Sequence, residues 1–188
     1  MKKKFHKVMD NPFIICKNMY LRPVEISDAS SIQKWHNDPE LRKLARYGEL
    51  PATLEKEEED IKAASRALDE AYLMVIKKRD NKPIGFIRVN DLTSSTRDVW
   101  LRMIIGDKSA WGKSFAEEAL RSVLEWLFYE LNIHRVTLGT YVTNKRALKF
   151  FEKMGFKREG ILREAHFEDG TYHDIISFGL LRKEFHKK

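Results

Sequence analysis

The sequence predicts one domain of the mixed α/β (α+β) class, in which a mainly antiparallel sheet of about seven strands is flanked by helices. Two apolar periodicities support this prediction. Some stretches alternate between apolar and polar residues, as in a strand, and others have the 3.6-residue period of a helix. The chain has 188 residues, 43% of them hydrophobic, which is enough to bury a substantial core. We find no repeat and no linker, so we expect one domain over residues 19–188 after a loose leader at residues 1–18.

The first half of the chain predicts one strand, three helices and a hairpin. The expected elements are a strand at residues 19–25, helices at 28–36, 40–45 and 53–68, and strands at 72–78 and 83–92. Ser27 or Asp28 suits the first helix as its N-cap, and the proline at Pro39 follows the point where that helix ends. Residues 79–82 have the composition of a turn, which joins the last two strands as a hairpin.

The second half is organised around residues 99–131. The expected elements are a strand at residues 99–106, a helix at 116–131, a strand at 134–142, a helix at 144–155, and a hairpin of strands at 156–167 and 172–181. The buried face of the first helix is marked by Ala116, Ala119, Leu120, Val123, Leu127 and Leu131. The last hairpin turns at residues 168–171, which read Glu-Asp-Gly-Thr.

The loop before that helix ends in Trp111-Gly112-Lys113-Ser114. A strand that turns tightly into a helix presents free backbone N–H groups and the positive end of the helix dipole, a combination that binds phosphate. Lys113 adds a mobile cation beside these groups. The sequence therefore predicts a phosphorylated ligand whose anionic part is held mainly by backbone.

The loop has two other interpretations, a P-loop and an ordinary turn. A P-loop has four residues between its two glycines, whereas five residues separate Gly106 from Gly112. We also find no second strand that ends in an aspartate suited to hold magnesium, so nucleotide hydrolysis is disfavoured. The loop by itself is also consistent with an ordinary strand–loop–helix unit that binds no ligand, in which Gly112 is only a turn residue.

A second motif occupies residues 144–156, which read NKRALKFFEKMGF. Asn144 suits a helix N-cap, and Gly155 suits a helix stop. On these two motifs, in this order and spacing, the chain resembles the GNAT (GCN5-related N-acetyltransferase) superfamily, and within it the ribosomal-protein N-terminal acetyltransferase (RimJ/RimL-like) branch. The family motifs are Arg/Gln-x-x-Gly-x-Gly/Ala and Asn-x-x-Ala-x-x-x-Tyr-x-x-x-Gly-Phe, and the resemblance spans residues 20–182.

The resemblance implies an acetyltransferase-like domain that moves an acetyl group from the co-substrate acetyl-coenzyme A (acetyl-CoA) to a primary amine. It implies direct attack in a ternary complex, without a covalent enzyme intermediate and without a metal. The cofactor-binding residues that it implies are Met103, Ile104, Ile105, Trp111, Gly112, Lys113, Ser114, Phe115, Ala116, Asn144 and Phe151. Backbone groups at residues 103–105 would contact the pantetheine arm, and backbone amides at residues 112–116 would hold the pyrophosphate.

The chain departs from the family at positions that carry chemistry. Phe151 stands where the family has the tyrosine that protonates the coenzyme A thiolate, and Leu101 stands where some members carry a glutamate. Ser114 replaces a glycine. Water can protonate the thiolate, or the low pKa of a thiol makes donation unnecessary. The catalytic candidates that remain are Tyr141 and Asn144, with His134, His166 and His173 as candidates to accept the proton of the amine.

Composition limits the compartment and the partners. Cys16 is the only cysteine, which excludes a disulfide framework and favours the reducing cytoplasm. A nucleophilic role for Cys16 is disfavoured because no His–Asp arrangement lies near it in the sequence. The net charge of +7 suits an anionic ligand, whereas nucleic-acid binding is disfavoured because the lysines are spread out. No apolar run is long enough to span a membrane, and the N-terminus lacks the features of a signal peptide.

The sequence does not distinguish four possible acceptors of the acetyl group: a protein N-terminus, a polyamine, an amino sugar and an antibiotic. The branch resemblance favours a protein N-terminal amine, on a ribosomal or other protein, and a homodimer is a further expected partnership. Candidate substrate contacts are Arg42, Arg46, Tyr47 and Glu49. A different function also stays open: a coenzyme A-binding sensor or interaction domain that does not catalyse, since Phe151 and Leu101 supply neither acid nor base.

Overall fold

A computed structural model of the chain describes residues 9–44 and 50–186. Its strands are β1 (Ile14–Ile15), β2 (Met19–Pro23), β3 (Ala71–Lys77), β4 (Lys82–Asn90), β5 (Asp98–Ile104), β6 (Arg135–Tyr141), β7 (Lys157–Glu168) and β8 (Thr171–Leu181). Its α-helices are α1 (Ala29–Asn37), α2 (Pro39–Leu44), α3 (Leu54–Arg66), α4 (Phe115–Glu125) and α5 (Lys145–Lys153). Short 3₁₀ turns lie at Ile26–Asp28, Lys108–Ala110 and Arg182–Glu184, and a π-helical turn, Trp126–Glu130, continues α4.

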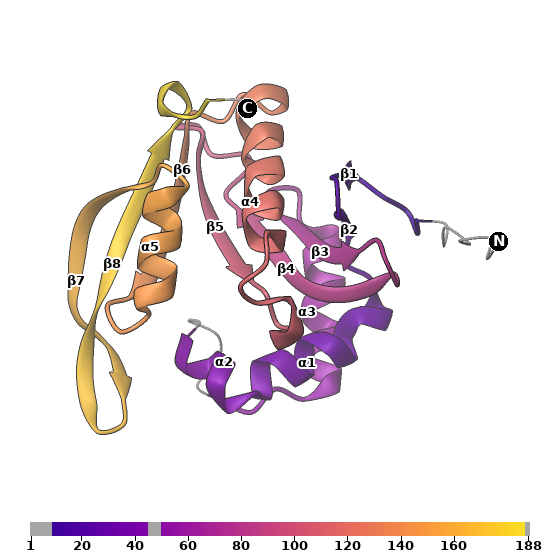
Figure 1. The fold of residues 1–188 in the computed structure, drawn as a ribbon, viewed down its shortest axis with the longest axis horizontal. Helices are drawn as coiled ribbons and strands as arrows, with labels where there is room; N and C mark the ends of the chain where they lie inside the picture. Colours follow the sequence, from indigo (N-terminus) through magenta and orange to yellow (C-terminus); the bar gives the residue numbers. More distant parts are fainter. Residues whose placement is uncertain (1–8, 45–49, 187–188) are drawn as a thin grey trace.

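All described strands form one sheet, with the order β1-β2-β3-β4-β5-β6-β8-β7 (Figure 1). Neighbouring strands are antiparallel except β5 and β6, which are parallel. The predicted class and the predicted order of elements are therefore confirmed, with eight strands instead of about seven. The extra strand, β1, pairs Ile14 with Leu21 of β2, inside the stretch predicted as a loose leader. A strand of two residues has no alternation from which it could be predicted.

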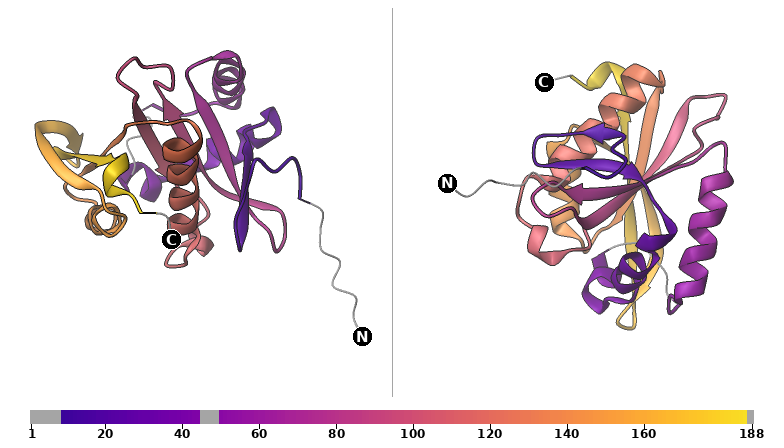
Figure 2. Two further views of the ribbon diagram at one scale, coloured as in Figure 1. Left: turned by 90° about the horizontal axis from the view of Figure 1, so that it is seen from above. Right: turned by 90° about the vertical axis from the view of Figure 1, so that its right-hand side faces the viewer.

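Helices cover both faces of the sheet, and each face has its own core (Figure 2). The larger core lies under α4 and α5, and it buries Leu120, Val123 and Leu148. The smaller core lies on the opposite face, under α1, α2 and α3. Leu131 was predicted on the buried face of the α4 helix, but it is 39% exposed because the π-helical turn before it changes the helical period.

Glycine at position 85 of β4 lets β5 approach closely. A Cβ atom at Gly85 would lie 2.1 Å from the carbonyl oxygen of Ile104, so β5 would have to move. We expect Gly85→Ala to lower the free energy of unfolding by about 1–3 kcal/mol, measured by urea denaturation. Gly160→Ala is the matched control, because nothing lies within 4 Å of a Cβ at that position. Equal losses in the two variants would contradict the prediction.

β5 and β6 are paired over only part of their length. Asp98–Trp100 pair with Arg135–Thr137, and no further pair joins the two strands in the described chain. The other edge of β5 is paired with β4 as far as Ile104. The edge of β5 that faces β6 therefore carries backbone groups without a strand partner from residue 101 to residue 104, among the described strands. The candidate functional site lies beside this gap between β5 and β6.

Candidate functional site

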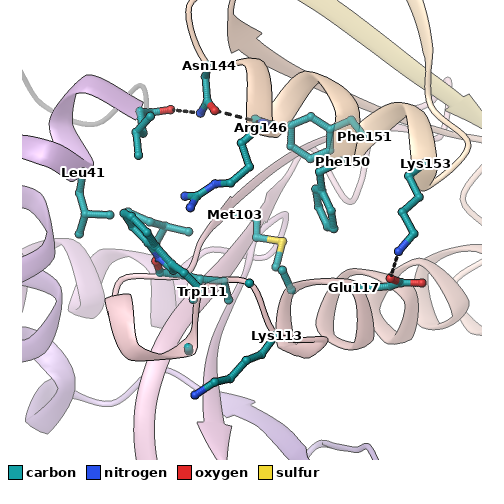
Figure 3. Close-up of a pocket in the computed structure, with 17 residues that line it drawn as sticks. Leu41, Met103, Trp111, Lys113, Glu117, Asn144, Arg146, Phe150, Phe151 and Lys153 are labelled. Carbon is teal, nitrogen blue, oxygen red and sulfur yellow. Dashed lines mark hydrogen bonds and ion pairs between the residues drawn. The ribbon is translucent and has the colours of Figure 1, made fainter.

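A cavity of about 360 Å³ opens beside the gap, between the end of β5, the start of α4 and the start of α5 (Figure 3). Its lining residues are Leu41, Leu44, Met103, Ile104, Ile105, Ala110, Trp111, Gly112, Lys113, Ala116, Glu117, Asn144, Arg146, Ala147, Phe150, Phe151 and Lys153. We call it the front cavity. A cavity of this size can hold part of a large ligand, and the rest of that ligand would extend into solvent.

The start of α4 lies at the edge of the front cavity, whose lining includes Ala116 and Glu117. Ser114 is the N-cap, and the first hydrogen bond of the helix runs from the Glu118 N–H to the Ser114 carbonyl at 2.8 Å. The three amides of residues 115–117 precede that bond, so the helix itself gives them no acceptor. Gly112 supplies the turn into the helix, with φ of 71°. Together with the helix dipole, these amides form a place for an anion.

Three cations and one carboxylate belong to the described lining of the front cavity. The Arg146 guanidinium lies 4.1 Å from the centre of the Trp111 ring, and Lys153 pairs with Glu117 at 2.6 Å (Figure 3). The Lys113 ammonium donates to the Ser109 carbonyl at 2.7 Å. Figure 3 shows Lys113 pointing away from Phe150. Arg146, rather than the predicted Lys113, therefore aims its charge into the cavity.

The loop that carries these residues is held by Trp111. The indole N–H of Trp111 donates to the Ile105 carbonyl at 2.7 Å, which ties the loop back to the end of β5. Trp111 thus fixes the loop and supports the Arg146 guanidinium by a cation–π contact.

Asn144 holds two elements together at the rim of the cavity. It is 7% exposed, its side-chain oxygen accepts from the Ala147 N–H at 3.0 Å, and its amide donates to the Leu44 carbonyl at 2.7 Å. The predicted N-cap of α5 is therefore confirmed, and the same side chain ties the end of α2 to the start of α5 (Figure 3).

We expect Asn144→Ala to lower the free energy of unfolding by about 1–3 kcal/mol, because it removes a cap and leaves the partly buried Leu44 carbonyl without its donor. Asn144→Asp keeps the cap but places a carboxylate against the Leu44 carbonyl. Thermal and urea denaturation of both variants separate the two contributions. If Asn144→Asp matched the wild type, the tether to α2 would contribute nothing.

A second cavity, of about 90 Å³, adjoins the front cavity, and its lining includes residues of β5 and β6. It shares Met103, Asn144 and Phe151 with the front cavity. The residues that line only the second cavity are Leu101, Arg102, Leu138, Gly139, Thr140 and Tyr141. Neighbouring residues of a strand point to opposite faces, so Met103 and Arg102 lie on opposite faces of β5. We call this the through-sheet cavity, because its lining includes residues of both faces of β5.

Most of the residues predicted to bind the cofactor come together here. Those that line the front cavity are Met103, Ile104, Ile105, Trp111, Gly112, Lys113, Ala116, Asn144 and Phe151. Ser114 and Phe115 do not line it, because Ser114 begins α4 at the surface and Phe115 packs against the larger core. Arg146 was not predicted as a site residue, although it stands two positions after Asn144 in the second motif. Its position on the first turn of α5 was the available signal.

The predicted acid–base candidates are scattered. Tyr141 lines the through-sheet cavity, and its ring stacks on His166 with centroids 3.7 Å apart. The imidazole Nε2 of His166 lies 3.7 Å from a Glu168 carboxylate oxygen. His134 and His173 line neither cavity. Arg42 lies on α2 outside both linings, and Arg46, Tyr47 and Glu49 fall outside the described residues.

Cys16 lies apart from both cavities, where its thiol is 3.0 Å from the Ser122 hydroxyl. Burial raises the pKa of the Cys16 thiol, which keeps it protonated and disfavours a thiolate nucleophile.

Known proteins resemble this chain in sequence. The sequence profile of the family described as "Acetyltransferase (GNAT) domain" matches residues 18–157. An uncharacterized N-acetyltransferase, YokL, of Bacillus subtilis is 31% identical over 62% of this chain and 65% of its own length. A spermidine N(1)-acetyltransferase of Vibrio cholerae is 28% identical over 59% of this chain and 64% of its own length. The chain therefore spans just under two thirds of these two relatives.

A solved structure shows the same fold over nearly the whole chain. The crystal structure of spermidine N-acetyltransferase from Vibrio cholerae, in complex with CoA and spermine, superposes with a TM-score of 0.82. The two chains share 24% sequence identity, and the match covers 89% of this chain and 97% of that one.

Proposed function

This chain belongs to the GNAT family of acetyltransferases, and from that premise we propose that it transfers an acetyl group directly to an α-amine that enters from the opposite face of the sheet. Acetyl-CoA is the co-substrate of the family. The observation that carries the proposal is that the two cavities adjoin and share part of their lining. The start of α4, which suits an anion, lies beside one, and the other lies where β5 and β6 are not paired.

The described residues of the front cavity fit coenzyme A. The free amides at the start of α4 suit its diphosphate, and the Arg146 guanidinium supplies a charge beside them. The unpaired edge of β5, at residues 101–104, offers N–H and C=O groups to the amides of the pantetheine arm. The thioester end would then lie near Phe151, which lines both cavities.

The transfer forms one carbon–nitrogen bond and breaks one carbon–sulfur bond. The lone pair of a neutral amine attacks the thioester carbonyl carbon, the thiolate leaves, and the amine proton passes to water. Phe151 has no proton to give, but a thiol pKa of about 8.5 means that solvent can protonate the departing sulfur at neutral pH. The chain therefore acts mainly by holding the two reactants together and by lining the meeting point with apolar side chains.

Charge and basicity favour an α-amine as the acceptor. The titratable side chains in the described lining of the through-sheet cavity are Arg102 and Tyr141, and no carboxylate belongs to that lining. A polyamine carries several positive charges that this lining does not neutralise. An α-amino group has a pKa of about 7.7–8.0, so it is partly neutral at pH 7, whereas an alkyl amine with a pKa of about 10.4 is almost fully charged.

A polyamine acceptor is the second candidate, because one similar protein is named a spermidine N(1)-acetyltransferase. A ribosomal protein is one source of an α-amine. That partner, a homodimer and a cytoplasmic location stay predictions from the sequence. No helix among the described residues is long and apolar enough to cross a bilayer.

The test is an acceptor panel with thiol release and mass spectrometry as readouts. The panel holds short peptides with free N-termini, the same peptides with blocked N-termini and one lysine, spermidine and glucosamine. We expect acetylation of the free N-termini. Acetylation of spermidine alone would favour the second candidate. Binding of acetyl-CoA by calorimetry without thiol release from any amine would favour a sensor, and no binding would refute the proposal.

A further inference from the structure

We propose that Arg102 selects an acceptor that carries a carboxylate close to its reacting amine; this inference rests on the proposed function. Arg102 lies on β5 next to Met103, and both residues line the through-sheet cavity. Met103 also lines the front cavity, whereas Arg102 does not. The Arg102 side chain therefore belongs to the face by which the acceptor enters.

The charge of Arg102 has no counterion among the described residues. The Nη2 group of Arg102 donates a hydrogen bond to the side-chain oxygen of Asn90 at 2.9 Å, and this amide oxygen is neutral. Two arginines on the same face of the sheet are neutralised: Arg88 by Asp60 and Glu70, and Arg135 by Asp98 and Glu159. A guanidinium has five N–H donors, so most of those of Arg102 remain for a ligand.

Arg102 is the one charged side chain in the described lining of the through-sheet cavity. Arg102 is exposed, whereas Leu101, Leu138 and Phe151 line the cavity from the side of the larger core, so none of these three brings a competing charge. No carboxylate belongs to the described lining, so a second positive charge on the acceptor would meet repulsion there. The site therefore distinguishes acceptors by the sign of the charge that they carry beside the amine.

A carboxylate is the anion that fits best. The planar guanidinium can donate two parallel hydrogen bonds to the two oxygens of a carboxylate, a geometry that adds direction as well as charge. Two sources supply a carboxylate near a primary amine: an acidic side chain at a peptide N-terminus, and the free α-carboxylate of an amino acid. Both present the same chemistry to Arg102.

The experiment compares acceptors that differ only in this charge. One arm uses C-terminally amidated peptides that start with Asp, Asn or Lys, and the other compares asparagine with asparagine amide. The value of kcat/KM is measured by thiol release for the wild type, Arg102→Gln and Arg102→Glu. Arg79→Gln is the matched control, because it removes one exposed positive charge in the β3–β4 turn, outside both cavities.

We expect the wild type to prefer the acidic member of one arm by about tenfold. Arg102→Gln should abolish this preference, Arg102→Glu should reverse it in favour of Lys, and Arg79→Gln should leave it unchanged. The arm that shows the preference identifies the source of the carboxylate. A wild type without preference, or a preference that survives in Arg102→Gln, overturns the inference while the proposed function stands. If no amine is acetylated although acetyl-CoA binds, the proposed function fails as well.

Discussion

Replacing Ser114 with aspartate is expected to weaken acetyl-CoA binding about thirtyfold, or about 2 kcal/mol, while making the protein slightly more stable. Ser114 is the N-cap of α4, and its side chain makes no capping hydrogen bond. An aspartate there can accept from the amides of Ala116 or Glu117 and stabilise the helix by about 0.5–1 kcal/mol.

The loss of affinity has two causes. The cap carboxylate competes with the diphosphate for the same N–H groups, and it places a negative charge beside the phosphates. Two unit charges 4 Å apart interact by about 4 kcal/mol at an effective dielectric constant near 20, and solvent at this exposed position reduces that value.

Calorimetric titration and urea denaturation test both halves of this prediction. Ser114→Asn is the matched control, because it caps the helix without a charge and should lose much less affinity. The difference between the two variants should shrink as salt is added, since screening weakens repulsion between exposed charges. Unchanged affinity in Ser114→Asp would show that the diphosphate is not held at the start of α4.

Arg22→Met is expected to cause the largest loss of stability, about 3–5 kcal/mol in the free energy of unfolding. Arg22 on β2 donates two hydrogen bonds to the Asp28 carboxylate, at 2.7 and 2.9 Å, and the residues are 7% and 4% exposed. Methionine fills the space but leaves the Asp28 charge buried without its cation. Since Asp28 directly precedes α1, the loss should also loosen that helix.

A double-mutant cycle checks the mechanism. Asp28→Asn removes the charge, so Arg22→Met combined with Asp28→Asn should be more stable than Arg22→Met alone. Lys43→Ala is a control at an exposed ion pair, with Asp169, and should cost less than about 1 kcal/mol. If the double variant were as unstable as the single one, the unpaired charge would not be the cause.

Regular periodicity explains why much of the fold could be predicted. Val136 and Leu138 alternate on β6 and are 0% and 1% exposed, and Gly155 ends α5 with φ of 96°. These features depend on neighbours in the sequence, which the sequence displays directly. The gap between β5 and β6 could not be predicted in this way, because a strand keeps the same alternation whether its edge is paired or free.

The parts of the candidate site that consist of backbone groups could be predicted from the sequence. The glycine-marked turn at Gly112 and the free amides after it follow from the local sequence. Side-chain direction was not predictable, because it depends on the fold: Lys113 folds back onto the Ser109 carbonyl, while Arg146 crosses to Trp111 from another helix. The predicted acceptor contacts at 46, 47 and 49 stay predictions, since they fall outside the described residues.

The short pairing between Asp98–Trp100 and Arg135–Thr137 has a consequence for the lifetime of the protein. It divides the sheet into two halves, one ending at β5 and one beginning at β6. Only this short pairing, the seam, joins the two halves by strand hydrogen bonds. A pantetheine arm laid along the free edge of β5 would act as a substitute strand that reinforces this seam. Because a ligand that binds only the folded state stabilises it by mass action, a cell rich in the acetyl carrier would retain more intact enzyme than a starved one.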